Sequence, residues 1–177
     1  MNSRVLISPI GDFPSKVLEA VDRIVRKVFG LGVTIAPVLE DIQFAWNADR
    51  CQYHSTPILE KLAEEAPDGT AKVAALCRVD LFIPILTYVF GEAQLDGRAC
   101  IVSSYRLADS STGPEEQFIS RMAKEVAHEL GHTFNLRHCP DPACLMHYCR
   151  SESDVDHKSD QFCRYCKVLL GDALGKQ

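Results

Sequence analysis

The residues best suited to chemistry lie close together between positions 128 and 166. They begin with His128-Glu129-Leu130-Gly131-His132, which has the pattern H-E-x-x-H. On a helix, residues four apart differ by about 40° around the axis, so both imidazoles can reach one zinc ion. Glu129 is turned by about 100° from His128, beside the metal, where it can hold a water without ligating. Zinc lowers the pKa of a bound water to about 7, and a nearby carboxylate can move its proton to a leaving amine. These residues therefore predict peptide hydrolysis, whereas two incidental helical histidines are the alternative.

A catalytic zinc usually has three protein ligands and a water, and His138 is the candidate for the third ligand. If the helix continued past His132, His138 would lie about 240° round and about 9 Å further along, too far to coordinate. The chain must therefore turn back, and Asn135 stands where glycine would adopt a left-handed conformation at least cost. Asn tolerates that conformation, at a penalty of about 1 kcal/mol or less. We expect the site to be slightly weakened, not abolished.

A second group of possible ligands follows directly. Four cysteines fall within 28 residues as two pairs, Cys139 with Cys144 and Cys163 with Cys166. The second pair has the C-x2-C spacing with which two sulfurs grip one tetrahedral ion. We expect a structural zinc, with disulfides as the alternative. The other cysteines are scattered and are predicted to be small buried residues: Cys51, Cys77, Cys100 and Cys149. Because His138 and Cys139 are adjacent, a rigid cysteine site would also fix the third imidazole.

Hydrophobic periodicity predicts the elements that position these residues. Strands are expected at 3–9, 33–38, 72–79 and 98–104, and helices at 15–29, from Ser55 or Thr56, and from about 114 after a loop and helix start at 110–114. Turns are expected at 67–69 and 96–97, and residues 40–55 have no regular pattern. Strands alternating with helices predict an α/β layer. Residues from 139 onward are predicted to be irregular and to need a bound metal or another cross-link in order to fold, because they have too little apolar core.

Length, net charge and hydropathy argue for a single-domain protein and against nucleic-acid-binding and membrane proteins. The chain has 177 residues, the length of one domain, and a net charge of −5 without a basic block, which argues against nucleic-acid binding and a membrane patch. No apolar run approaches the roughly 20 residues of a membrane helix, and the first residues lack the succession of a signal peptide. We expect a monomer in the cytoplasm, where clustered cysteines indicate metal binding.

The motifs resemble those of the archaemetzincins, zinc metallopeptidases of the metzincin clan. That family has HExxHxxGxxHCx4CxM, about 17 residues, then CxxC. This chain has HELGHTFNLRHC, PDPA, CLM, a gap of 16 residues and CRYC. It departs from the pattern at Asn135 and by one residue in the gap. The upstream segments QYHSTPILEKL, VDLFIP and YVFGEAQLDGRACIVSSYRL are also similar, so the resemblance covers most of the chain.

The resemblance implies a fold and a set of roles. The fold class is α+β/α/β, a compact metzincin-like fold with a twisted mixed sheet, an active-site helix and an irregular zinc-stapled C-terminal subdomain. Residues 1–177 would form a single metallopeptidase domain, 1–138 being the N-terminal α/β subdomain and 139–177 the C-terminal one. Two Zn²⁺ ions are implied: a catalytic one on His128, His132 and His138, and a structural one on Cys139, Cys144, Cys163 and Cys166.

The resemblance also implies roles in catalysis. Glu129 would be base and acid, Met146 would form a turn beneath the zinc ligands, and Tyr148 would stabilise the oxyanion or simply pack. The substrate would be a peptide, with aminopeptidase action on short peptides as one form of the activity. Strand 98–104 would form the edge of the cleft and pair with the substrate backbone. A zinc-stabilised binding protein without turnover is the alternative. Other polar residues are predicted to be surface or supporting residues: His54, His147, His157, and a solvated loop with Asp154, Asp156, Lys158 and Asp160.

Overall fold

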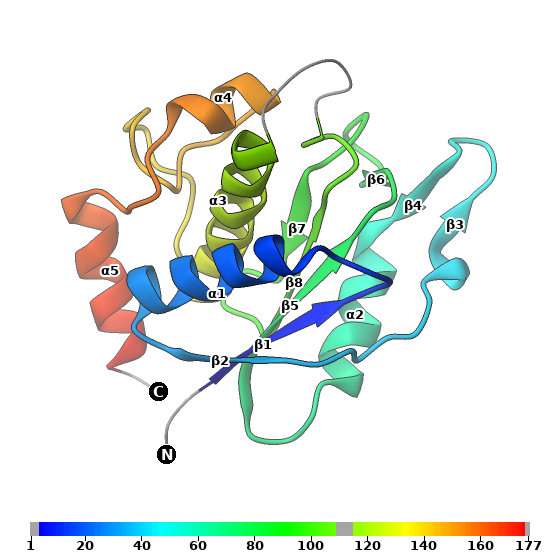
Figure 1. The fold of residues 1–177 in the computed structure, drawn as a ribbon, viewed down its shortest axis with the longest axis horizontal. Coiled ribbons are helices and arrows are strands. Elements are labelled where there is room, and N and C mark those ends of the chain that lie inside the picture. The colour runs from blue at the N-terminus through cyan, green and yellow to red at the C-terminus, as the bar shows by residue number, and fades with distance from the viewer. Residues whose placement is uncertain (1–3, 109–114, 176–177) are drawn as a thin grey trace.

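A twisted mixed sheet forms the centre of the molecule. The computed structural model describes residues 4–108 and 115–175, and Figure 1 shows its elements. The sheet has the order β2-β1-β5-β8-β7, with β1 at Arg4–Pro9, β2 at Gly32–Ile35, β5 at Thr70–Cys77, β7 at Gly91–Ala93 and β8 at Ala99–Ser103. Every pairing is parallel except that of β7 with β8. The predicted mixed sheet is therefore confirmed.

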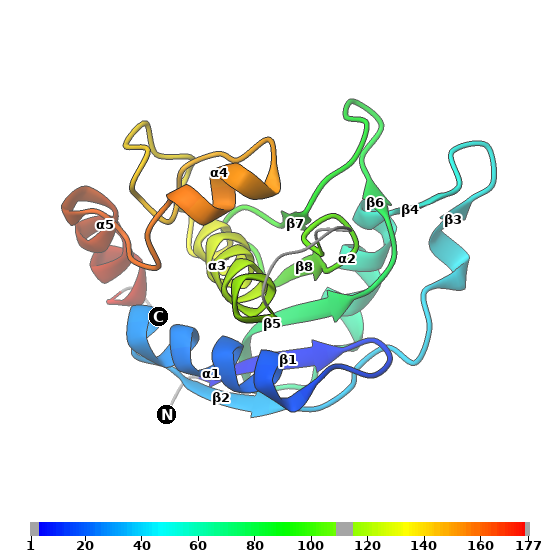
Figure 2. The ribbon, with the colours of Figure 1, turned by 45° about the horizontal axis from the view of Figure 1, so that its top comes forward.

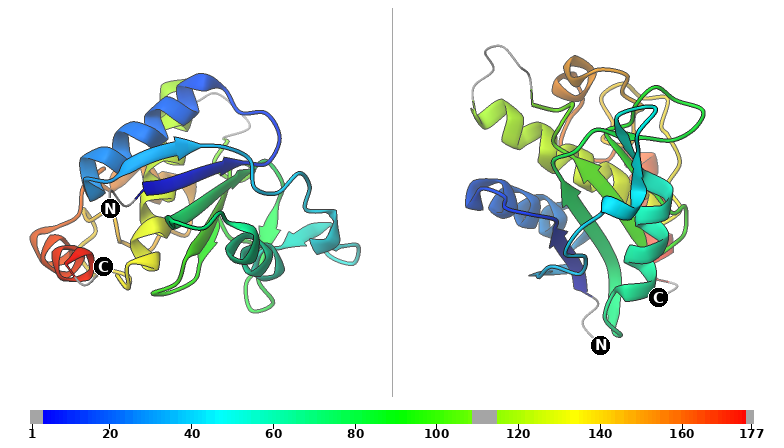
Figure 3. Two further views of the ribbon diagram at one scale, coloured as in Figure 1. Left: turned by 90° about the horizontal axis from the view of Figure 1, so that it is seen from below. Right: turned by 90° about the vertical axis from the view of Figure 1, so that its right-hand side faces the viewer.

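Helices cover both faces of this sheet. Helices α1 (Ser15–Phe29) and α3 (Glu115–Thr133) lie on one face and α2 (Ser55–Glu65) on the other, as the right-hand view of Figure 3 shows. Side chains alternate along β1 accordingly. Val5 and Ile7 belong to the core beneath α1 and α3, whereas Leu6 belongs to the core beneath α2. The sheet is buried on both faces, which explains the continuous apolar runs of β5 and β8.

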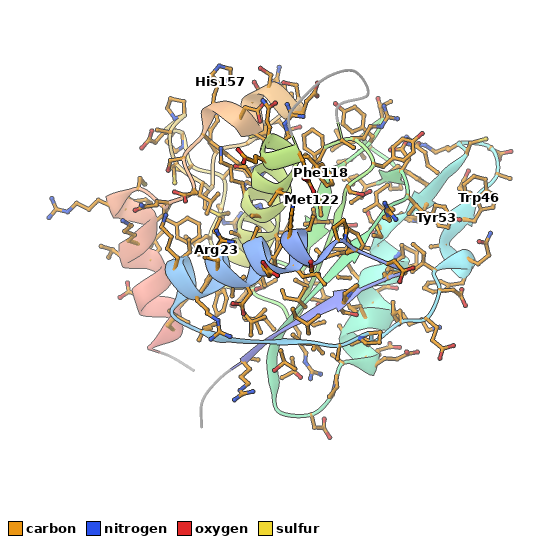
Figure 4. The ribbon with its side chains drawn as sticks, in the orientation of Figure 1. Arg23, Trp46, Tyr53, Phe118, Met122 and His157 are labelled. Atoms are coloured by element: carbon orange, nitrogen blue, oxygen red, sulfur yellow. The ribbon has the colours of Figure 1, made fainter. Side chains whose placement is uncertain are left out.

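The apolar stripe of α3 was largely predicted. Met122, Val126 and Leu130 are fully buried, while Phe118 and Ile119 are only partly buried at its edge. Figure 4 shows Phe118 and Met122 where α3 passes α1. The helix start expected at 110–114 lies outside the described residues. Within the described ranges, none of the helices has the length and apolar character that crossing a bilayer requires.

Strand 98–104 does not form the edge of the sheet, so that expectation is wrong. Strand β8 is hydrogen-bonded to β5 on one side and to β7 on the other. The edge strand on this side is β7, which precedes the turn at Asp96 and Gly97 and runs antiparallel to β8. The sequence pattern missed β7 because three residues are too few to show an alternation.

A small second sheet takes two of its three strands from residues 40–55, which were expected to be irregular. It contains β3 (Trp46–Asn47), β4 (Gln52–His54) and β6 (Leu81–Phe82), preceded by the 3-10 turn Gln43–Ala45. The rings of Trp46 and Tyr53 lie 5.0 Å apart on its outer side (Figure 4). Each strand has two or three residues, so no periodicity could predict it.

The C-terminal segment is also more regular than predicted. It contains α4 (Glu152–His157) and α5 (Arg164–Leu174), which Figure 2 shows beside α3. Ser151 and Asp154 form a capping box at the start of α4, each side chain accepting from the other's backbone N–H. This reciprocal cap explains how a six-residue helix with a single buried residue can form.

Candidate active site

Helix α3 carries the first three residues of the predicted centre in its last two turns. His128 and His132 lie one turn apart, and their Nε2 atoms are 3.2 Å from each other. His128 Nδ1 donates to the Leu145 carbonyl at 2.9 Å, and His132 Nδ1 donates to the Leu136 carbonyl at 2.7 Å. Because each Nδ1 carries the proton, both Nε2 atoms present lone pairs to the same point.

The chain turns back at Asn135. Asn135 has φ 64°, and its N–H donates to His132 O at 2.9 Å, while Leu136 N–H donates to Gly131 O at 3.1 Å. These are the two hydrogen bonds of a Schellman motif, in which the residue after the helix is left-handed. The predicted backbone reversal is therefore confirmed, with asparagine in place of glycine. The reversal delivers Leu136 O to His132 and carries the chain to His138.

The three imidazoles meet at one place. One nitrogen from each of His128, His132 and His138 lies within 4.8 Å of the other two. Two nitrogens on a tetrahedral zinc at about 2.0–2.1 Å lie about 3.3–3.4 Å apart, close to the observed Nε2 separation. Burial lowers the pKa of His132 to about 4 and lowers those of His128 and His138. The rings are thus neutral near pH 7, which is the form that binds a metal. The donor set fits zinc.

Glu129 lies against the edge strand at the side of the histidines. A Cβ built on Gly91 of β7 would be 2.8 Å from Glu129 Cγ and 2.5 Å from the Ile101 carbonyl oxygen. Glycine at this position therefore lets the carboxylate lie close to β7. Burial, and next the charge of Glu125, raise the pKa of the Glu129 carboxyl well above its usual range. A raised pKa suits a group that must both accept and donate a proton.

A cleft of about 430 Å³ opens in front of these groups. One wall comes from residues 83–95 and the other from residues 148–150. Its floor contains Glu125, His128, Glu129, His132 and His138. Tyr88 Oη of the first wall donates to the Arg150 carbonyl of the second at 2.8 Å, so the walls are joined at one point.

Met146 lies beneath the histidines, as predicted. It is fully buried, and a Cβ built on Gly131 would lie 2.5 Å from its Sδ. Gly131 is the residue between Leu130 and His132 in the motif, so the methionine packs against the one position without a side chain in the helix turn that carries the histidines. This contact explains a glycine inside a helix, where it otherwise costs about 1 kcal/mol relative to alanine.

Tyr148 stands at the rim of the cleft. Its ring centroid is 5.1 Å from that of His138, and the residue is 44% exposed. The other histidines lie outside the cluster. His147 Nδ1 donates to the Cys139 carbonyl at 2.9 Å, His54 stacks on Phe82, and His157 is exposed on the outer side of α4 (Figure 4). Their predicted surface or supporting roles are consistent with these positions.

The four clustered cysteines form the second candidate centre. Their sulfurs lie within 4.8 Å of one another, and the Sγ atoms of Cys139 and Cys163 are 3.8 Å apart. Two sulfurs on one tetrahedral zinc at about 2.3 Å lie about 3.8 Å apart, so this donor set also fits zinc. Burial raises the pKa of Cys139 and of Cys166, whose sulfur also faces that of Cys144. Four thiolates this close need a cation between them.

The scattered cysteines were only partly predicted. Cys77 and Cys100 are buried in the sheet, as expected. Cys51 is exposed with φ 52° in a turn, which contradicts the expectation. Cys149 is half-buried and lines the cleft. None of the eight, all within the described ranges, forms a disulfide.

The charged segment after residue 153 is not a solvated loop, so that prediction is wrong. Lys158 is fully buried and pairs with Glu125 at 2.7 Å. Asp156 pairs with the buried Arg121 of α3 at 2.6 Å, and Asp154 caps α4. Asp154 is nevertheless exposed, and the Asp160 side chain forms a solvent-exposed pair with Lys27, both as expected. Sequence reasoning missed these contacts because charged residues are usually exposed and the partners lie more than thirty residues away.

Comparisons with known proteins agree with this arrangement. The model of Peptidase family M54 matches residues 6–172. The archaemetzincin of Halobacterium salinarum is 37% identical over 170 residues, covering 93% of this chain and 97% of the relative. The crystal structure of archaemetzincin from Methanopyrus kandleri is 33% identical with a TM-score of 0.85, covering 98% of this chain and 96% of that one.

A third similar protein is described as zinc-dependent. The crystal structure of a zinc-dependent peptidase from Methanocorpusculum labreanum is 25% identical with a TM-score of 0.85, covering 94% of this chain and 99% of that one. The fold, the two donor sets and the matches over nearly the full chain together assign it to peptidase family M54, the archaemetzincins, and make it a zinc metallopeptidase.

Proposed function

We propose that His128, His132 and His138 hold the catalytic zinc and that Glu129 is the general base and acid of peptide hydrolysis. The observation that carries this assignment is that three neutral imidazoles present nitrogens to one point on the floor of a cleft that also contains Glu129. Zinc bound there would supply a Lewis acid for the carbonyl and lower the pKa of a water to about 7.

The proton steps belong to Glu129. Its carboxylate takes a proton from the attacking water, whose oxygen bonds to the carbonyl carbon of the substrate. The same oxygen of Glu129 then gives the proton to the amide nitrogen, and the C–N bond breaks. Tyr148, beside His138, is the proposed donor to the oxyanion.

The second zinc ion is proposed to lie among Cys139, Cys144, Cys163 and Cys166, which makes two ions per chain. It would hold residues 139–177 as a subdomain on residues 1–138. Four sulfurs within 4.8 Å of one another, one pair of them 3.8 Å apart, support this role. Because the sulfurs must be thiolates, we place the protein in a reducing compartment, the cytoplasm. We also propose that it acts as a monomer.

We further propose that the substrates are short peptides cut near one end, with aminopeptidase action as the preferred form. The support is the contact between Tyr88 and the Arg150 carbonyl, because a long chain running through the cleft would have to break it. The free edge of β7 can pair with the backbone of such a peptide.

A peptide-library digest tests both the mechanism and the substrate class. Each peptide is supplied with a free and with an acetylated N-terminus, with and without added zinc. We expect zinc-dependent cleavage next to the free N-terminus. Cleavage inside long acetylated peptides would contradict the aminopeptidase proposal alone, and absence of any cleavage would favour the binding-protein alternative.

The Glu129→Gln variant tests the proton steps. Gln keeps the shape of the side chain but accepts no proton, so we expect turnover to fall by about 100-fold or more while both zinc ions remain bound. The measurement is kcat together with metal content per chain. Unchanged turnover would exclude Glu129 as the base.

A further inference from the structure

A buried ion pair lies directly behind the histidine cluster. Lys158 Nζ is 2.7 Å from Glu125 Oε1, and the two side chains are 0% and 4% exposed. The same ammonium is 3.5 Å from Nδ1 of His128. Glu125 lies on α3 one turn before His128 and Glu129 and forms part of the cleft floor. Lys158 comes instead from the C-terminal segment, just after α4.

We propose that Lys158 is a positioning residue for His128, contributed to the active site by the C-terminal segment. The inference rests on the proposed function, since it takes His128 to be a zinc ligand. Lys158 touches neither substrate nor the reacting atoms. Its ammonium holds the Glu125 carboxylate in an ion pair and packs against the Nδ1 side of the His128 ring.

The backbone on the C-terminal side of Lys158 is hydrogen-bonded to residues 143–145, and the carbonyl of Leu145 in that segment orients His128. Ser159 N–H donates to Ala143 O at 2.9 Å, and Leu145 N–H donates to Gln161 O at 2.9 Å. Leu145 O in turn accepts from His128 Nδ1. One pair of hydrogen-bonded segments therefore carries both the carbonyl that accepts from this nitrogen and the ammonium that lies beside it.

Lys124 of α3 holds the backbone of the segment that contains Lys158. Its Nζ donates to the carbonyls of Val155, Asp156 and Lys158, at 3.0, 3.2 and 2.7 Å. The main chain of residue 158 therefore cannot shift without breaking buried hydrogen bonds.

Stability alone does not explain this pair. Buried ion pairs are often replaced by apolar residues of similar volume without loss of stability, because desolvation offsets the attraction. The carboxylate of Glu125 lies on the cleft floor beside the histidines and Glu129, where an unpaired negative charge would affect the site. Without its cation, Glu125 would be a second unpaired carboxylate on the cleft floor, able to compete with Glu129 or to reach the metal itself. Lys158 leaves Glu129 as the one acidic side chain of the floor that is free to act.

The test compares Lys158→Met with Asp156→Asn. Met keeps the length and volume of the lysine stem but removes the ammonium. Asp156→Asn breaks a second ion pair between α3 and the C-terminal segment, the pair of Asp156 with Arg121. The measurements are zinc affinity of the histidine site by chelator competition, kcat and KM on a cleaved peptide, and the melting temperature of the metal-free protein.

We expect Lys158→Met to lower the zinc affinity of the histidine site and kcat by about 10- to 100-fold, the usual effect of losing a group that orients a metal ligand. KM should stay within about twofold of wild type. Asp156→Asn should lower the melting temperature without changing zinc affinity or kcat. Wild-type affinity and kcat in Lys158→Met would overturn the proposal, as would equal losses in both variants.

Glu125→Gln keeps the test decisive if Lys158→Met does not fold. Gln retains the hydrogen bond and shape but leaves the ammonium beside His128 without its counter-charge, so zinc affinity should again fall by about 10-fold or more. Unchanged affinity would overturn the proposal. If wild-type protein binds no zinc at the histidines, it is the proposed function that fails.

Discussion

At the scale of single residues, the site depends on one asparagine in a left-handed conformation. Asn135 has φ 64° and ends the catalytic helix, and the third imidazole follows three residues later. Its short amide side chain tolerates this conformation better than other residues with a Cβ. The turn gives the site its geometry at a small local cost in free energy.

Two substitutions at this position separate conformation from chemistry. Asn135→Gly should change the free energy of unfolding of the zinc-loaded protein by less than about 1 kcal/mol. Asn135→Val should lower it by roughly 1–3 kcal/mol, because a β-branched residue is strained at positive φ. Denaturant titrations measure both. Equal stability of the two variants would mean that the backbone reversal does not depend on the residue at 135.

The residue scale also shows what spacing can and cannot predict. The three histidines and four cysteines were predicted because their spacing along the chain reflects the geometry of a single ion. Lys158 was not, because nothing near it in the sequence indicates burial. Its partner Glu125 lies 33 residues away, and only the placement of α4 on α3 brings the two charges together.

At the scale of elements, the contact between α3 and the segment around Met146 decides how a substitution at a helical glycine changes stability. Helix propensity alone would predict that alanine is better at every such position. Gly131 in α3 and Gly171 in α5 both lie inside helices. A Cβ at Gly131 would lie 2.5 Å from Met146 Sδ, whereas at Gly171 nothing lies within 4 Å. The same chemical change should therefore have opposite effects at the two positions.

We expect Gly131→Ala to destabilise the protein by about 1–3 kcal/mol, the usual cost of overfilling a core. Gly171→Ala should instead stabilise it by roughly 0.5–1 kcal/mol, because alanine is the better helix former. Thermal unfolding of the two variants beside wild type measures this difference. Stabilisation by both would show that Met146 moves aside freely.

The C-terminal elements depend on the cysteines. Helix α4 has one buried residue and α5 has two, too little apolar surface to hold a segment of this length. If zinc holds them, Cys163→Ser should cost several kcal/mol, which lowers the melting temperature by roughly 10 °C or more. Cys51→Ser, at an exposed cysteine outside the cluster, is the control. An unchanged melting temperature in Cys163→Ser would mean that the segment is held in another way.

Apart from the eleven-residue helix α5, the elements that were not predicted share one physical property: they are short. Strands β3, β4, β6 and β7 have two or three residues each, and α4 has six. Periodicity needs more residues than this, and hydrogen bonds to distant segments decide such structure. The long helices α1 and α3 and strands β1, β5 and β8 were predicted because their apolar patterns are long enough.

At the scale of the whole molecule, the two donor clusters differ in their access to solvent. The histidines lie at the floor of an open cleft, and His138 is itself exposed. Three of the four cysteines are buried between α5 and the segment of Met146. A chelator therefore reaches one site much more easily than the other.

We expect the purified protein to contain two zinc ions per chain and to lose them in two steps. A mild chelator should remove the first ion and all activity while the fold remains, as circular dichroism would show. The second should leave only with unfolding. Metal analysis after each step is the measurement. A preparation that never holds more than one ion would contradict the two-site assignment.

The contact between Gly131 and Met146 has a consequence for how such chains can diverge. Any lineage that acquires a side chain at position 131 must shorten residue 146 at the same time, because both occupy one small volume against the turn of α3 that carries the histidines. The two positions, fifteen residues apart, are therefore expected to change together or not at all.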